Sequence, residues 1–133
     1  MIESVARWLR TRPVLSCAWM RRLAQISIRP SDRQAVEAAV CVARAQLPLE
    51  RAVLFGSKAR GDDDAESDID LLLLTARRCN WSEKRALLAA LWPLERSHGV
   101  VFSLLIVPTA EWEHGLYQVL PLRRAVERDG IAL

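Results

Sequence analysis

The chain is poor in the residues that build several common kinds of site. Its three cysteines, Cys17, Cys41 and Cys79, lie far apart and are odd in number, so they form neither a disulfide framework nor a zinc-ligand pattern. Its two histidines, His98 and His114, have no partner at metal-site spacing. We interpret the histidines as structural or surface residues, and the cysteines predict a reduced, cytoplasmic setting.

Long apolar runs are also missing. The longest uncharged apolar stretches fall short of the ~20 residues that a membrane-spanning helix needs, so the sequence predicts no membrane span. Nevertheless 51% of the residues are hydrophobic, which excludes a disordered chain. A length of 133 residues suits one domain with a substantial core, and the sequence contains no internal repeat.

Positive charge is concentrated at the N-terminus, although the net charge is only +3. Residues 1–30 contain six arginines against the single acidic residue Glu3, so residues 31–133 are slightly acidic. We therefore divide the chain into a basic N-terminal extension, 1–30, and a folded domain, 31–133. The extension is a targeting peptide, an over-called start upstream of Met20, or an amphipathic helix that docks on a partner, RNA or an anionic surface. The sequence does not decide among these.

The hydrophobic pattern of residues 31–133 predicts an α/β domain with a small mixed sheet. We expect Ser31 to cap a first helix that ends before Pro48, and Ser82 to cap a second helix that Pro93 kinks and His98-Gly99 ends. Leu87, Leu88, Leu91 and Leu94 share one face of that second helix, and Trp81, Trp92 and Trp112 are expected to pack in or around the core. The predicted strands are 52–55, 69–74 and 100–107, with a helical turn at 57–60, a solvated loop at 62–66 and a closing helix from Pro121 to Gly130.

The most informative segment lies between the first two predicted strands. Asp68 and Asp70 alternate at the start of a strand, so their side chains project from the same face. Two adjacent carboxylates repel unless a cation lies between them, and such oxygen ligands suit Mg²⁺ bridged to substrate phosphates. Upstream, Gly56 allows the backbone to approach a phosphate closely, and Ser57 offers a hydroxyl and an amide to the same anion.

This segment resembles the hallmark of the minimal nucleotidyltransferases of the DNA polymerase beta superfamily, which is Gly-Ser, ten residues, then Asp-x-Asp. The match at the family spacing consists of Gly56, Ser57, Asp68 and Asp70. The flanking sequences at 59–61 and 67–71 are also similar to those of the family. The resemblance covers about residues 31–130. It implies a polymerase-beta-like α/β (α+β) core, a small mixed sheet with flanking helices.

The same resemblance implies a nucleotidyltransferase that moves a nucleoside monophosphate, AMP from ATP, onto a hydroxyl of a macromolecular acceptor. Gly56, Ser57 and Arg60 would bind the nucleotide, while Asp68 and Asp70 would be the catalytic residues and hold Mg²⁺. Stand-alone members of the family act as antitoxins that attach AMP to a tyrosine of a HEPN-type ribonuclease toxin. A toxin of that type is therefore the protein partner that the resemblance implies.

One feature departs from the family pattern. The family normally has a third carboxylate on a later strand, but residues 100–107 contain no acid, and the corresponding position is predicted to be Val101. This leaves three hypotheses: a weakened or special-substrate transferase, a catalytically degenerate nucleotide-binding and protein-interaction module, and transfer to RNA or to a small hydroxylated drug. The slight acidity of residues 31–133 disfavours an extended RNA-binding face.

Overall fold

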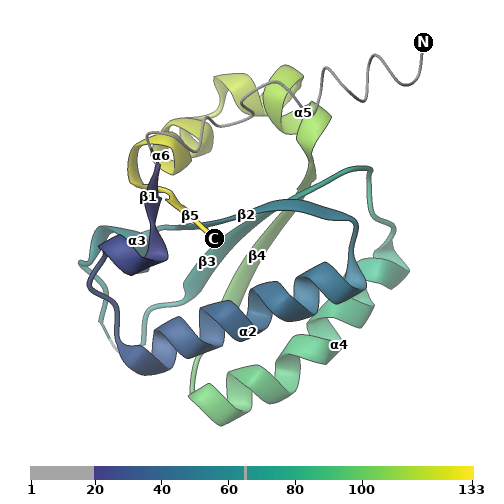
Figure 1. The fold of residues 1–133 in the computed structure, drawn as a ribbon. Helices are drawn as coiled ribbons and strands as arrows, with labels where there is room; N and C mark the ends of the chain where they lie inside the picture. The colour runs from purple at the N-terminus through teal and green to yellow at the C-terminus, as the bar shows by residue number, and fades with distance from the viewer. Residues whose placement is uncertain (1–19, 65) are drawn as a thin grey trace.

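The computed structural model describes residues 20–64 and 66–133 of the chain (Figure 1). Along the sequence its elements are β1 (Arg21–Arg22), η1 (Leu23–Gln25), α2 (Pro30–Gln46), β2 (Leu49–Phe55), α3 (Ser57–Arg60), β3 (Ile69–Thr75), α4 (Trp81–His98), β4 (Phe102–Pro108), α5 (Thr109–His114), η2 (Leu116–Val119), α6 (Pro121–Asp129) and β5 (Ile131–Ala132).

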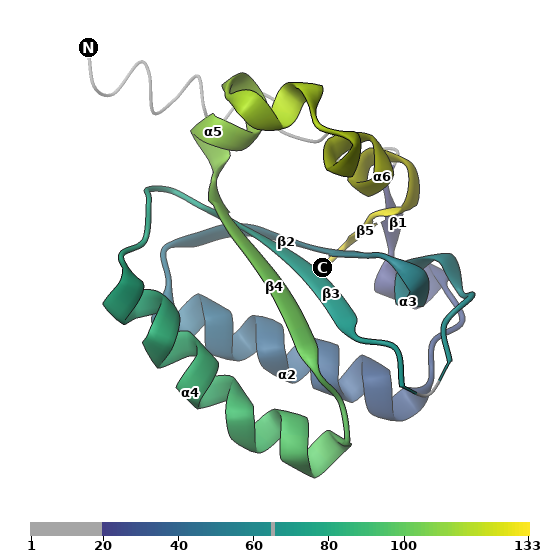
Figure 2. The same ribbon diagram turned by 180° about the vertical axis from the view of Figure 1, so that it is seen from behind.

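A five-stranded sheet in the order β1-β5-β2-β3-β4 forms the centre of the domain. β3 is antiparallel to β2 and parallel to β4, and α4 makes the crossover between β3 and β4. Helices α2 and α4 cover one face of the sheet, while α5, η2 and α6 lie on the other (Figures 1 and 2). This confirms the predicted α/β class with a small mixed sheet and flanking helices.

The central strand β3 is buried on both faces. Leu71 and Leu73 pack into the apolar layer beneath α2 and α4, whereas Leu72 and Leu74 pack into the layer beneath α5 and α6. Trp112 is fully buried in that second layer, as predicted. A continuous apolar run is typical of such a strand, because every side chain of the strand meets a covered face.

Both long helices begin differently from the prediction. Pro30 is the first residue of α2, where its fixed φ and missing N–H are tolerated, so Ser31 lies inside the helix and is not its cap. Helix α4 is capped by Asn80, whose side chain accepts a 2.8 Å hydrogen bond from the Glu83 backbone N–H, and not by Ser82. The helix continues through Pro93, and Gly99, with φ +64°, ends it as predicted.

The outward side of α4 is more apolar than the sequence pattern predicts. Trp81 and Trp92 are 70% and 59% exposed, so the expectation that they pack in or around the core is wrong. Leu88 is 46% exposed and does not share the buried face of Leu87 and Leu91. The contact of α4 with the rest of the domain is therefore narrower than the leucine pattern indicates.

The segment before α2 also joins the sheet. Strand β1 pairs in parallel with β5, and the side chain of Met20 is buried beside them. Neither two-residue strand was predicted, and the packed part of the chain begins N-terminal to the boundary drawn at residue 31. The three interpretations of the extension fall mainly on residues 1–19, outside the described residues. None of the helices within 20–64 and 66–133 is long and apolar enough to cross a membrane.

Candidate active site

The Gly-Ser turn and the two aspartates meet at one end of the β2–β3 hairpin. Pairing of these strands places Phe55 opposite Asp70, so Gly56 lies against the Asp70 side chain. Gly56 has φ +76°, and a Cβ on this residue would lie 2.1 Å from Asp70 Oδ2. Glycine is required here both for its backbone conformation and for the space that the carboxylate occupies. The structure therefore brings Gly56 and Asp70 into contact.

Asp68 and Asp70 form a carboxylate pair with which no basic side chain among the described residues forms an ion pair. Asp68 is exposed just before β3, while Asp70 is half-buried on the strand. Burial, and then the charge of Asp68, raises the pKa of Asp70, although a hydrogen bond from Ser103 and the charge of Arg60 act in the opposite direction. Within the described residues no basic side chain forms an ion pair with either aspartate.

The neighbouring strand β4 brings a hydroxyl to this pair instead of a third acid. In the parallel β3–β4 register Ser103 is the partner of Asp70. Val101 lies just before β4, is 53% exposed, and accepts a 2.8 Å backbone hydrogen bond from Ile69. Ser103 is therefore the β4 residue beside Asp70, and Val101, the position predicted for the third acid, lies two residues earlier.

Glu95 is a third carboxylate at the edge of the site, which the sequence did not place. It lies near the C-terminal end of α4, and its backbone carbonyl accepts a 3.0 Å hydrogen bond from the Val100 N–H, at the turn into β4. Burial, and then the charge of Asp68, raises the pKa of the Glu95 carboxyl. Its helical position carried no sequence signal, because only the approach of α4 to Asp68 makes it part of the site.

The two basic residues of α3 have different surroundings. Arg60 is exposed and pairs with Asp62 at 3.1 Å and with Asp129, at the end of α6, at 3.8 Å. It is also close enough to lower the pKa of Asp70. Ser57 begins α3 and is half-buried between Gly56 and the rest of this turn. Ser57 and Arg60 thus lie on the turn that contacts the aspartate pair.

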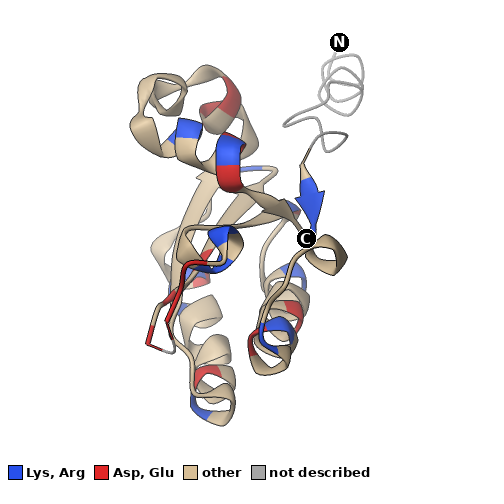
Figure 3. Ribbon diagram, turned by 90° about the vertical axis from the view of Figure 1, so that its left-hand side faces the viewer, with Lys and Arg blue, Asp and Glu red and all other residues tan. Residues whose placement is uncertain are grey.

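Lys58, in contrast, points away from solvent into a buried ion-pair network. Its side chain is 2% exposed, and Nζ donates hydrogen bonds to Asp32 Oδ2 at 2.9 Å and to Asp63 Oδ2 at 3.1 Å. Arg29 Nη1 also donates to Asp63 Oδ2, at 3.1 Å. The network joins α2, α3 and the acidic loop, whose red ribbon lies next to the blue of α3 in Figure 3. Asp63 is consequently not a solvated loop residue, as was predicted for the whole 62–66 segment.

The donor set suits one hard divalent cation that is completed by a substrate. Within residues 20–64 and 66–133 no group of three or more histidine, cysteine, aspartate or glutamate side chains could hold a metal by itself. Asp68 and Asp70 supply two adjacent carboxylates whose mutual repulsion a cation would relieve. Mg²⁺ is characteristically bound through one or two carboxylates, with waters and substrate phosphates supplying the other ligands. The residues therefore fit Mg²⁺.

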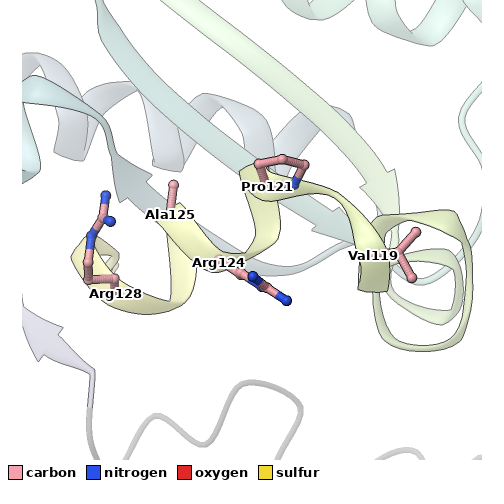
Figure 4. Close-up of a pocket in the computed structure, with 5 residues that line it drawn as sticks. All are labelled: Val119, Pro121, Arg124, Ala125 and Arg128. Atoms are coloured by element: carbon pink, nitrogen blue, oxygen red, sulfur yellow. The ribbon is translucent and has the colours of Figure 1, made fainter.

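A surface hollow of the domain lies elsewhere. It has a volume of about 470 Å³ and runs along the outside of α6, where Val119, Pro121 and Ala125 line it together with Arg124 and Arg128 (Figure 4). None of the predicted site residues lines this hollow. The candidate active site is therefore the carboxylate pair with the Gly-Ser turn, and it does not include this hollow.

Comparison with solved structures supports the fold. A structure provisionally described as a minimal nucleotidyltransferase aligns with a TM-score of 0.56 and 28% identity, over 82% of this chain and 99% of that one. A toxin–antitoxin structure with AMP-PNP aligns with a TM-score of 0.51 and 18% identity, over 78% of this chain and 72% of that one. The second likeness, at this low identity, concerns the fold alone.

Sequence comparison points in the same direction. A protein of Methanocaldococcus jannaschii, provisionally named a protein adenylyltransferase, is 37% identical over 60 residues. The match covers 45% of this chain and 57% of that relative. The family model described as polymerase beta nucleotidyltransferase matches residues 40–106, about half of the chain, and this range includes the Gly-Ser turn and both aspartates. The chain belongs to the polymerase beta nucleotidyltransferase family.

Proposed function

We propose that this protein transfers AMP from ATP to a hydroxyl group of a protein acceptor, with Mg²⁺ held by Asp68 and Asp70. The observation that carries the proposal is a carboxylate pair that forms no ion pair with a described basic side chain and whose Asp70 packs directly against Gly56 of the Gly-Ser turn. Family membership supports nucleotidyl transfer, and the M. jannaschii relative, which this chain matches over 57% of its length, supports adenylyl transfer to protein.

The chain's own residues would mainly position the reactants. Gly56 and Ser57 would hold the β- and γ-phosphates, and the exposed Arg60 would turn from Asp62 toward triphosphate oxygens, because exposed ion pairs are weak. Mg²⁺, when bound, supplies charge neutralisation to the triphosphate. The acceptor oxygen forms a bond to the α-phosphorus as the bond to the β-phosphate oxygen breaks, and pyrophosphate and the hydroxyl proton leave.

The acceptor that we propose is a tyrosine of a HEPN-type toxin. Resemblance to stand-alone antitoxins of the family supports this choice, and the fold is shared with chains in two toxin–antitoxin structures. A phenolic hydroxyl ionises near pH 10, far below an aliphatic alcohol, so it depends less on a general base. The presence of Ser103 beside Asp70, where a third acid would help to activate the acceptor, fits an acceptor of this kind.

A second candidate function follows from the same strand. If transfer is impossible without a carboxylate on β4, the chain is a degenerate module that binds Mg²⁺ and nucleotide and neutralises its partner by contact. The observation that favours it is that the acid-free β4 places only a hydroxyl beside Asp70. The two functions differ in one measurable respect, which is whether AMP becomes covalently attached to an acceptor.

Label transfer distinguishes them. The purified chain is incubated with Mg²⁺ and α-phosphate-labelled ATP in a lysate of the source cells, beside the Asp68→Asn/Asp70→Asn variant. We expect a labelled protein band that falls at least about 10²-fold in the variant, because the metal contributes several kcal/mol of charge stabilisation. ATP labelled at the γ-phosphate should give no such band. A matched control, Glu37→Gln/Glu50→Gln, removes two exposed carboxylates, one on α2 and one at the start of β2, away from the site.

Binding of Mg²⁺-ATP to the same proteins, measured by calorimetry, completes the test. Binding by the native chain without any label transfer supports the binding module. Equal binding by the native chain and the Asp68→Asn/Asp70→Asn variant contradicts both functions, because each of them places the nucleotide on these two carboxylates. The glutamate control should bind and transfer as the native chain does.

A further inference from the structure

Strand β4 is the last strand on one side of the sheet, and in Figure 2 it lies in front of β3. Its pairing with β3 runs from Phe102 to Pro108 without a bulge, and no residue of the strand is charged. Native proteins usually protect a sheet edge with a lysine, a bulge or a proline, and on this strand only Pro108, at its end, is such a residue. An edge of this kind is a template for pairing with another strand.

The hydrogen bonds between β3 and β4 determine which backbone groups of β4 point outward. The Ile69 N–H donates to the Val101 carbonyl at 2.8 Å, so Val101 and every second residue after it turn their backbone groups toward β3. The N–H and C=O groups of Phe102, Leu104 and Ile106 therefore point away from β3. Because β4 ends the sheet formed by residues 20–64 and 66–133, no described strand pairs with these groups.

We propose that β4 pairs antiparallel with β4 of a second copy of the chain, about a two-fold axis at Leu104. Leu104 then faces Leu104 of the second copy, and Phe102 faces Ile106. All three are positions whose backbone groups point outward, so every outward N–H and C=O group of both strands gains a partner. Each contact occurs twice, as the symmetry of a two-fold dimer requires.

The two ends of the edge favour a second copy over an unrelated strand. At one end, Pro108 has no N–H to donate. At the other end, the Val100 N–H already donates to the Glu95 carbonyl at 3.0 Å. With the axis at Leu104 these two positions face each other, so the paired ladder stops where neither residue has a free donor. Moving the axis to either neighbouring residue would place one of them opposite a residue whose carbonyl needs a donor.

The side chains of β4 agree with this pairing. Leu104 and Ile106 are only partly buried in the layer beneath α2 and α4, and Phe102 belongs to the same layer. Across the two strands Phe102 would pack against Ile106, and aromatic side chains paired with β-branched ones stabilise antiparallel strands. Because β4 has no charged side chain, no like charges face each other. The pairing therefore continues the apolar layer from one copy to the next.

Sedimentation equilibrium over a concentration series tests the proposal, with circular dichroism to confirm folding. One pair of short strands is a small interface, so we expect a dissociation constant of about 1–100 μM for the native chain. Leu104→Pro removes an outward N–H without removing a donor to β3, and should raise that constant at least about 10-fold. Leu104→Val keeps the N–H and should dimerise as the native chain does. A native chain that stays monomeric up to about 1 mM, or a folded Leu104→Pro variant that dimerises unchanged, overturns the proposal.

Single cysteines test the register independently and keep every backbone N–H. In a Cys17→Ser/Cys41→Ser background, oxidation should link Leu104→Cys into a disulfide dimer, because opposite residues of a hydrogen-bonded pair have Cα atoms about 5.5 Å apart. Ile106→Cys should not cross-link, since it faces Phe102, whereas Phe102→Cys/Ile106→Cys should. Cross-linking through Ile106→Cys alone, or its absence in Leu104→Cys, contradicts the two-fold axis at Leu104.

Discussion

Two acidic segments lie a few residues apart in this chain, and their electrostatic surroundings are opposite. In the loop after α3, Asp63 accepts hydrogen bonds from Lys58 and Arg29, and although burial opposes the effect, the lysine holds the pKa of Asp63 below its usual value. At the start of β3, Asp68 and Asp70 form no ion pair among the described residues, and burial together with Asp68 raises the pKa of Asp70. Basic side chains therefore form ion pairs with the first segment, and none among the described residues does so with the second.

The difference separates carboxylates that basic side chains pair with from the carboxylates that we propose to bind a cation. A buried charge without a partner is costly, so folding normally pairs it, as it pairs Lys58 with Asp32 and Asp63. The pair Asp68 and Asp70, which no basic side chain pairs with and which Gly56 contacts, is where we propose that a cation binds together with the substrate. Both segments read as aspartate-rich in the sequence, and only the positions of the basic side chains distinguish them.

Removing the buried cation should have the largest effect on stability. Lys58→Met removes the buried partner of Asp32 and Asp63 and leaves them with the half-exposed Arg29, and loss of one member of a buried pair costs about 3–5 kcal/mol. Urea denaturation should record this loss. Arg60→Met, two residues away, should cost less than about 1 kcal/mol, because the Arg60 ion pairs are exposed.

The triple variant Lys58→Met/Asp32→Asn/Asp63→Asn is the control for the buried network. It removes the stranded carboxylates and should recover part of the stability that Lys58→Met loses. Equal unfolding free energies for Lys58→Met and Arg60→Met would show that the buried network does not anchor the α3 turn. In that case the contrast between the two acidic segments would have no energetic basis.

The sequence predicts the central strands and the site turn, but not the compensating network. The apolar runs of β2 and β3, and the Gly-Ser and Asp-x-Asp spacing between them, are local patterns that survive in the structure. Lys58 pairs with Asp32, 26 residues away, and no local pattern encodes that contact. Strands β1 and β5 have two residues each, too short for a periodic signal, and depend on pairing with each other and with β2.

The β4 residue that lies beside Asp70 could not be predicted, because the hydrophobic pattern does not determine the register between β3 and β4. Val101 and Ser103 differ by two residues, so a strand with either residue beside Asp70 presents the same face to the core. The hydrophobic pattern is therefore identical for the two registers. Pairing with β3 selects Ser103, together with the backbone hydrogen bond from Ile69 to Val101.

Placing a carboxylate on β4 should increase the negative charge beside Asp68 and Asp70. Ser103→Asp places an acid beside Asp70, and if the proposed transfer is correct, it should raise the rate of AMP transfer by up to about 10²-fold, the lower range of general-base effects. It should also make the metal-free protein less stable, because a third negative charge joins two that already repel. Label transfer and urea denaturation measure the two effects.

Val101→Asp is the matched control for that gain. Its side chain is exposed and precedes β4, so it should raise the transfer rate less than Ser103→Asp does. A larger gain from Val101→Asp would show that the third-acid position is the one predicted from the sequence. The β3–β4 register would then not define the site.

The smallest predicted effect is that substituting Asp63 and substituting Asp70 by asparagine change the stability of the protein in opposite directions. The folded-state pKa of Asp63 is lowered, so its contribution to stability is present above the ordinary pKa near 3.8 and is lost as pH falls. The pKa of Asp70 is raised, so its contribution is present below 3.8 and is lost as pH rises. At pH 7 and without metal, Asp63→Asn should therefore destabilise the protein by about 2 kcal/mol, and Asp70→Asn should stabilise it by about 0.5–2 kcal/mol.

Thermal unfolding in a chelating buffer at several pH values measures this reversal. The stabilisation by Asp70→Asn should decrease as the pH falls toward 4, because the native carboxyl then protonates and loses its repulsion with Asp68. Saturating Mg²⁺-ATP should favour the native chain over Asp70→Asn, since only the intact pair gains binding energy from the cation. Two asparagine variants that both destabilise the metal-free protein at pH 7 would mean that Asp70 is compensated after all, and that the two acidic segments do not differ in kind.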